Sequence, residues 1–534
     1  MLHRAVEPHR SANLMKGGLM VVPPWNPNEA EQLGVRFLTS DHFMMQFFRR
    51  PGILALASCT VLAFATSQAW SAVRYVNSGL TTGINDGTSW SNAYRGSDAL
   101  ARALGASVAG DEIWVAAGLY KATTTTSRAA THTLRTGVGV YGGFLGGETL
   151  RDQRNHVANV TTVTGDLLSN DAGVNNLTDN SYHVFVGTGA GAGAVLDGFT
   201  IRGGVANTAA PTDADKGGGL LIVGSGSPTV RNCRFLGNRC TFGGGAVYIF
   251  AASATFVDCV FEQNVGGSFG GAIDMNQVVG NFQRCLFVGN TASRAGACES
   301  YGGSQTAYTN CVFRGNSATG SNGGGALWIG VSSAVTVRNS TFTANSATSL
   351  AGCIINTGGT STVVNSILWG NTGPGGTTVA NQITNSGGAT NTSYSIVQGG
   401  YAGTLNINAD PLFVATASGN LRLSPGSPAI DSGINSFVPT GTTTDFDGNP
   451  RFRNDPTVAD SGNGTAPIVD RGAFERQPPP CPADLNGNGL VDAPDITALL
   501  SNWGGSGAGD INGDGVVSAP DITALLSAWG PCPG

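Results

Sequence analysis

Apolar and polar residues alternate in short stretches along the middle of the chain, and these stretches repeat. In Cys233-Arg234-Phe235 one residue separates the cysteine from the phenylalanine, so both side chains lie on the same face of an extended strand. The repeats are spaced by 26, 26, 26, 29 and 26 residues. They are NCRFLGN from Asn232, DCVFEQN from Asp258, RCLFVGN from Arg284, NCVFRGN from Asn310, NSTFTAN from Asn339 and NSILWGN from Asn365.

A second strand is predicted in each repeat, directly after a turn that is rich in glycine. One column of side chains is apolar and is predicted to face a shared interior: Val247, Ile273, Cys298, Leu327 and Ile354. The neighbouring column is mixed and is predicted to face water: Tyr248, Asp274, Glu299, Trp328 and Ile355.

The repeat length indicates the fold. A 26-residue unit without helical periodicity is too short for a strand and a helix, but it suits one coil of a parallel β-helix that rises about 4.8 Å per coil. Like residues would then stack as ladders, such as one of asparagines: Asn238, Asn264, Asn290, Asn316, Asn345 and Asn371. We therefore predict an all-β solenoid that starts near Ile113–Val115 and Val138–Tyr141, with an amphipathic helix over Ser97–Leu104 as its N-terminal cap.

Composition narrows the function. The chain has 534 residues, 80 of them glycine, with 12% charged residues and a net charge of −6. This balance excludes a nucleic-acid partner that is held by neutralisation of phosphates.

The N-terminal region is predicted to be a targeting segment. Arg49 and Arg50 precede the apolar run Ile53–Ala65, and small residues follow, as in a secretory signal peptide over 44–72. Residues 1–43 have no periodicity and are interpreted as a non-native extension ahead of the true start. The apolar run is shorter than the ~20 residues of a membrane span, so we expect an exported protein without a transmembrane segment in its mature chain.

The composition changes after the proline linker 477–480, where two 12-residue loops begin, 26 residues apart. Oxygen ligands stand at loop positions 1, 3, 5, 9 and 12, a backbone carbonyl at position 7 and glycine at position 6, as calcium loops require. Two calcium ions are the predicted cofactors. The ligands would be Asp484, Asn486, Asn488, Leu490, Asp492 and Asp495 in the first loop, and Asp510, Asn512, Asp514, Val516, Ser518 and Asp521 in the second.

Each loop continues into the sequence PDITALLS and a tryptophan. Ile496, Leu499, Leu500 and Trp503 fall on one helical face, as do their counterparts 26 residues later, so the two halves are predicted to pair through these faces. Cys481 and Cys532 bracket the region 481–534, and we expect a disulfide between them that clamps its ends.

The region 73–476 resembles a known group of proteins. The pairing of Gly270-Gly271-Ala272-Ile273 with Phe261-x-x-Asn264 is similar to the repeat of bacterial polymorphic outer-membrane proteins. The flanks, VYGGFLGGE from Val140, LSPGSPAIDSG from Leu423 and VDRGAFE from Val469, resemble bacterial surface proteins with a choice-of-anchor Q region. The resemblance implies a right-handed parallel β-helix of the pectin-lyase-like superfamily, which hosts many functions.

The region 481–534 resembles a type I dockerin, because its loop–helix unit is duplicated and lacks an incoming helix. The resemblance implies a cohesin-like partner. Dockerins recognise cohesin through loop positions 10 and 11, which here are Ala493-Pro494 and Ala519-Pro520. A surface-anchoring or sorting role is therefore an equal alternative.

The mixed column offers the sharpest candidate for catalysis. Asp274 and Glu299 would lie on adjacent coils about 5 Å apart, near the carboxyl separation of a retaining glycosidase. Tyr248 and Trp328 flank them and could bind a glycan through their rings. The alternative is that two acids share a hydrated column without chemistry.

Two functions follow from the sequence. The first is a secreted or cell-surface protein without catalysis, adhesive or glycan-binding and attached through its calcium-dependent tail. The second is a carbohydrate-active enzyme, either a polysaccharide lyase or a glycoside hydrolase. A cleft around Asp274 would favour the enzyme, and a flat exposed sheet would favour the first function.

Overall fold

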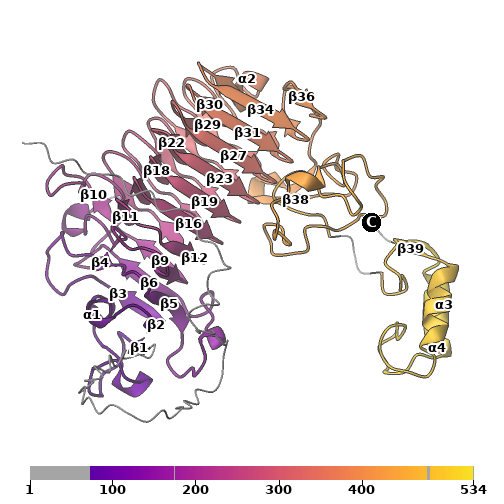
Figure 1. The fold of residues 1–534 in the computed structure, drawn as a ribbon, viewed down its shortest axis with the longest axis horizontal. Helices are drawn as coiled ribbons and strands as arrows, with labels where there is room; N and C mark the ends of the chain where they lie inside the picture. The colour runs from indigo at the N-terminus through magenta and orange to yellow at the C-terminus, as the bar shows by residue number, and fades with distance from the viewer. Residues whose placement is uncertain (1–71, 174, 478–480, 533–534) are drawn as a thin grey trace, which may run out of the picture. The chain divides into compact units, whose positions relative to one another are not determined.

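A computed structural model describes residues 72–173, 175–477 and 481–532 (Figure 1). The predicted extension 1–43, nearly all of the predicted signal peptide 44–72 and most of the proline linker lie outside the described residues. None of the helices formed by the described residues is both long and apolar enough for a membrane span.

The chain from 73 to 404 is a right-handed parallel β-helix with three long sheets. We call these sheets A, B and C. Each coil passes through sheet C, then sheet A, then sheet B, as β15, β16 and β17 do. Sheet A contains β1 Val73–Val76, β2 Glu112–Ala116, β5 Gly139–Phe144, β8 Val195–Asp197, β12 Thr229–Arg231, β16 Ser253–Val257, β19 Val279–Gln283, β23 Gln305–Thr309, β27 Ala334–Arg338, β31 Thr360–Val364, β34 Ala389–Ser393 and β36 Gly403–Thr404.

Sheets B and C complete each coil, and the fold class predicted from the repeat is confirmed. Sheet B contains β3 Gly118–Tyr120, β6 Thr161–Thr164, β9 Phe199–Arg202, β13 Arg234–Leu236, β17 Val260–Glu262, β20 Leu286–Val288, β24 Val312–Arg314, β28 Thr341–Thr343, β32 Ile367–Trp369 and β35 Ile396–Val397. Sheet C contains β4 His132–Thr133, β7 Phe185–Val186, β11 Leu220–Val223, β15 Val247–Phe250, β18 Ile273–Asn276, β22 Cys298–Tyr301, β26 Leu327–Ile329, β30 Ile354–Asn356 and β33 Ile383–Asn385.

Short strands lie at the corner between sheets B and C: β10 Val205–Ala206, β14 Arg239–Cys240, β21 Thr291–Ala292, β25 Ser317–Ala318 and β29 Ser346–Ala347. The remaining strands are β37 Phe413–Ala415 with β38 Asn420–Leu423, and β39 Leu490–Val491 with β40 Gly530–Pro531. The helices are α1 Ala99–Ala106, α2 Val379–Gln382, α3 Ala493–Ser501 and α4 Ala519–Ser527.

Like residues stack upon like along the interior. Phe235, Phe261, Phe287 and Phe313 pair in register, and their rings stack with centroids 5.1, 4.8 and 4.5 Å apart. A second file, beginning with Phe256, meets the first edge to face. These fully buried rings form the core that no single coil could build alone.

The predicted asparagine ladder is also present. The backbone N–H of Asn264 donates to Oδ1 of Asn290 at 3.0 Å, and each neighbouring coil repeats this bond. The last rung, Asn371, donates to Oε1 of Gln382 in α2. The ladder thus joins successive coils and ends at the short helix α2.

A helix covers the N-terminal end of the solenoid, and the chain after the last coil returns along its side. The helix α1 buries Leu100 and Leu104 against the first strands, as the predicted cap requires, although the helix begins and ends two residues later than predicted. At the other end, residues 410–476 fold back along the coils, where the side chain of Asn365 donates to the carbonyl of Ile434 at 2.9 Å. The stack itself starts at β1, one strand earlier than predicted, because Val73–Val76 pairs with β2.

Candidate functional site

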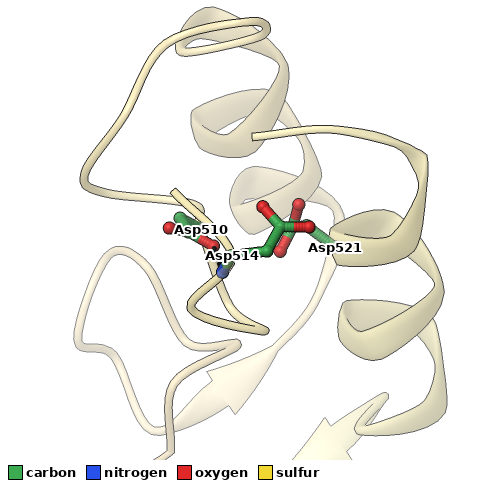
Figure 2. Close-up of side chains that lie close together, drawn as sticks. All are labelled: Asp510, Asp514 and Asp521. Carbon is green, nitrogen blue, oxygen red and sulfur yellow. Dashed lines mark hydrogen bonds between the residues drawn. The ribbon is translucent and has the colours of Figure 1, made fainter. Parts of the chain in front are cut away.

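The clearest group of oxygen ligands lies in the loop 510–521. Figure 2 shows Asp510, Asp514 and Asp521, and one carboxylate oxygen from each lies within 4.8 Å of the other two. Calcium binds oxygen at 2.3–2.6 Å, so ligands on opposite sides of the ion are about 5 Å apart. The distances between these carboxylates are therefore compatible with one calcium ion between them.

Backbone amide groups hold these carboxylates in place. Asp521 lies in the first turn of α4 and accepts hydrogen bonds from the N–H groups of Ile511 at 2.8 Å and Asn512 at 3.0 Å. Asp510 accepts from the N–H groups of Asp514 and Gly515. The hydrogen bonds from these amides lower the pKa of Asp521, so its carboxylate is ionised and ready for a cation.

The loop 484–495 repeats this arrangement. Asp484 accepts from the N–H groups of Gly487 and Gly489, both at 2.8 Å, and the fully buried Asp495 accepts from Leu485. Oδ1 of Asp492 is buried and has no partner, and burial together with repulsion from Asp495 and Asp484 raises the pKa of Asp492. A nearby cation would offset the repulsion at Asp492.

Both loops contain all of the predicted ligand positions. The structure brings three carboxylates of the second loop together, whereas the first loop has asparagine at positions 3 and 5 and its third acid at position 9. The side-chain oxygens of the remaining polar ligands bond backbone amides of their own loop, as Asn488 does with Leu490 and Asn512 with Asp514.

The small core beneath the loops contains part of the predicted pairing of helical faces. Leu499 and Leu525 are fully buried, with Val491 and Val517 beside them. Ile496 and Ile522 are partly buried against this core, so four of the predicted face residues pack together. The remaining members of the two faces are about half exposed: Leu500, Trp503, Leu526 and Trp529. Cys481 and Cys532 are joined with an S–S distance of 2.07 Å.

The mixed column of sheet C is in the predicted register but not in the predicted environment. Tyr248 pairs with Asp274, Asp274 with Glu299, and Glu299 with Trp328. Asp274 and Glu299 are 0% exposed and Tyr248 is 6% exposed, so the prediction that this column faces water is wrong. Even the aromatic ring of Tyr248, proposed as a glycan platform, is covered.

The cover is formed by the segments that lead into the strands, which we call the cover segments: 241–246, 266–272 and 291–297. Gly243 lies against the carboxyl group of Asp274 and Arg294 lies over the ring of Trp328, so these segments cover side chains on the outer face of sheet C. A Cβ atom on Gly243 would lie 2.0 Å from Oδ2 of Asp274, so only glycine can pass directly above this carboxyl group. Phe242, Phe269 and Arg294 project from the cover segments, and the two rings contact edge to face.

The two acids have unequal partners. Nε of Arg294 donates to Glu299 at 3.1 Å, and its guanidinium lies 4.0 Å from the ring centroid of Trp328. Neither oxygen of Asp274 has a hydrogen-bond partner. Lys216 is engaged by Asp213 at 2.7 Å.

Burial and charge set the protonation of the pair. Burial, reinforced by the neighbouring Glu299 carboxylate, raises the pKa of Asp274 well above its usual range. Burial also raises the pKa of Glu299 to about 7, against the opposing effect of Arg294. The arrangement thus places a neutral acid beside a titrating one, which is the division that acid–base catalysis requires.

The two larger pockets found among the described residues do not lead to Asp274 and Glu299. A pocket of about 400 Å³ lies over sheet A beside Thr362 and Phe437, and another of about 340 Å³ lies beside His156 and Asp258. Neither is lined by Asp274 or Glu299.

The fold defines the class of this chain as a parallel β-helix protein. Among solved structures, the crystal structure of pectate lyase Pel9A is similar, with 16% sequence identity and a TM-score of 0.40 over 77% of this chain and 97% of that chain. No family model matches the sequence, and no curated protein matches it.

Proposed function

We propose that this chain is an exported β-helix protein without catalysis, adhesive or glycan-binding, which is attached or sorted through a calcium-binding C-terminal segment. The carrying observation is the duplicated loop, in which Asp510, Asp514 and Asp521 converge within 4.8 Å. Asp274 and Glu299 are fully buried, which supports a scaffold that displays a surface rather than an enzyme with an open active site.

The two loops would each hold one calcium ion through the ligands named above. Calcium supplies a charge that offsets three carboxylates per loop and ties each loop to the first turn of its helix. Asp495 and Asp521 already fix that turn through backbone amides, so metal binding would lock a geometry that the chain has prepared.

Isothermal titration of the chelator-treated chain with calcium tests this proposal. We expect two ions per chain, one after Asp510→Ala and none after Asp510→Ala is combined with Asp484→Ala. Asp152→Ala, which removes an exposed acid outside the loops, is the matched control and should leave two ions. Calcium uptake that survives the double substitution would reject the assigned ligands.

The partner of the segment follows from its helices. Ala493-Pro494 and Ala519-Pro520 offer no hydroxyl or charge in the first helical turn, which supports a surface-anchoring protein as the partner, with a cohesin-like protein as the alternative. Calcium-dependent binding to isolated cell envelopes, compared with binding to a purified cohesin, distinguishes the two.

The alternative function is a carbohydrate-active enzyme, a polysaccharide lyase or glycoside hydrolase. The neutral Asp274 beside Glu299 favours it, with Asp274 as proton donor, Glu299 as nucleophile or base, and Tyr248 and Trp328 as sugar contacts. A polysaccharide panel scored separately for binding and for cleavage tests both functions. Cleavage that persists after Asp274→Asn with Glu299→Gln would eliminate this pair.

A further inference from the structure

The outer face of sheet C buries two carboxyl groups, Asp274 and Glu299, and only Glu299 has a basic side chain as its direct partner. Four elements place titratable or charged groups around Asp274: Glu299 on β22, Arg294 and Cys240 on neighbouring segments, and Tyr248 on β15. Two further groups, Lys216 and Tyr301, complete this shell. The only cations in this shell are Arg294 and Lys216.

Both cations are already committed. Arg294 is paired with Glu299 and lies between the rings of Phe269 and Trp328, at 4.3 and 4.0 Å from their centroids. Lys216 contacts Asp213 at 2.7 Å and Asp215 at 3.3 Å. An ionised Asp274 would therefore be a buried charge whose two nearby cations are already paired with other acids and relieve it only in part, and neither of its oxygens has a hydrogen-bond partner. This is an unfavourable state for a carboxylate.

The covering chain is poorly suited to retain such a charge. The cover segments 241–246 and 266–272 contain three and four glycines. Gly243 lies directly against the carboxyl group of Asp274, and 266–272 lies beside it, with Phe269 against Phe242. They carry no charged side chain themselves. The simplest relief for an ionised Asp274 is exposure to water through displacement of these two segments.

We propose that Asp274 and the cover segments 241–246 and 266–272 form a pH-sensitive latch, closed while Asp274 holds its proton and opened when the proton is lost. Opening would expose the outer face of β15 and β18. This inference goes beyond the proposed function, because the latch stands whether or not the face binds a glycan.

The direction of the response follows from linkage. The closed form holds the proton more tightly than the open form, in which the carboxyl is hydrated and titrates near its usual value of about 3.9. Between the two pKa values, the ratio of open to closed molecules rises about tenfold per pH unit for each proton released. The latch therefore opens on the alkaline side and stays closed in acid.

Hydrogen exchange of the full chain followed by mass spectrometry tests the latch. Protection factors, which remove the intrinsic pH dependence of exchange, are measured from about pH 5 to about pH 9. We expect the protection factor of 241–246 and 266–272 to fall by up to about tenfold per pH unit in this range. The matching segment 320–326, which precedes Trp328 and contains no acid, should keep a constant protection factor and shows that the coils remain folded.

Asp274→Asn keeps the shape of the side chain and removes its titration, so this variant should show no pH dependence in either segment. Equal slopes in the wild type and in Asp274→Asn would overturn the proposal. So would a wild-type slope in 241–246 no steeper than in 320–326, a comparison that needs no variant and stands even if Asp274→Asn does not fold.

Discussion

The asparagine ladder makes a quantitative prediction about how the coils are held together. Asn290 is fully buried, and its Oδ1 accepts from both the backbone N–H and Nδ2 of Asn264, at 3.0 and 2.9 Å. Its own Nδ2 donates to the carbonyl of Phe261 and to Oδ1 of Asn316, both at 2.9 Å. Asn290→Ala removes these four bonds and leaves the buried N–H of Asn264 without its acceptor.

The loss can be estimated from these contacts. One orphaned buried donor contributes about 1–3 kcal/mol, and each of the three other bonds about 0.5–1.5 kcal/mol, so the free energy of unfolding should fall by about 2.5–7.5 kcal/mol. Asn281, exposed on sheet A, supplies the control: Asn281→Ala should change the free energy of unfolding by less than about 0.5 kcal/mol.

Urea unfolding followed by circular dichroism measures both variants, with the shift in midpoint converted through a common slope. The variant Asn290→Asp tests the same contacts through their pH dependence. Its carboxylate oxygen would oppose the carbonyl of Phe261, so the new group should have a raised pKa, and the variant should lose stability as the pH rises above about 4. If Asn290→Ala unfolds at the same urea concentration as Asn281→Ala, the ladder does not stabilise the coils and the reasoning is refuted.

Three further predictions concern the C-terminal half of the chain. Chelation of calcium should lower the melting temperature of the segment 481–532 and leave that of the β-helix unchanged in calorimetry; a shift of the β-helix transition alone would contradict the proposed sites. Loss of the disulfide through Cys481→Ser with Cys532→Ser should destabilise that segment by about 4 kcal/mol, since the bond closes a loop with a sequence separation of 51, and an unchanged melting temperature would contradict this. Burial raises the pKa of Asp431 to about 8 and of Asp470 to about 7. Because these folded values lie above the unfolded ones, their contribution is complete below about pH 4 and is lost as the pH rises toward 8; Asp431→Asn should flatten the pH dependence of the melting temperature, and an unaltered profile would exclude Asp431 as its source.

The stacking of the coils could be predicted because it follows from periodicity alone. Once 26 residues separate Phe235 from Phe261, a parallel stack places the two rings in contact, and the same spacing sets the partners of Asn264. The convergence of Asp510, Asp514 and Asp521 was predictable for a related reason, because the position of each acid is fixed by its number within a 12-residue loop.

The environment of Asp274 could not be predicted in this way. Alternation shows that Asp274 points away from the interior, but it does not show what lies on the outside. The glycines at 243–245 indicate a turn, and a turn at a corner is the simplest interpretation. That these residues instead cover the sheet depends on Phe242 and Phe269 packing over the strand, a tertiary contact without a signal in the spacing.

The covered column also shows that an acid is not needed there for folding. Ile355 occupies the same column two coils beyond Glu299 and is itself fully buried, so an aliphatic side chain fits beneath a cover segment. A buried carboxyl group without a partner is less favourable than such a side chain by about 1–3 kcal/mol on the evidence of protein substitutions. Asp274 therefore weakens its own coil relative to the available alternative. A residue that lowers stability, where a neighbouring coil has a more stable side chain at the same position, is expected when the protein uses that residue for a function. This is the physical argument for seeking such a function in the protonation of Asp274.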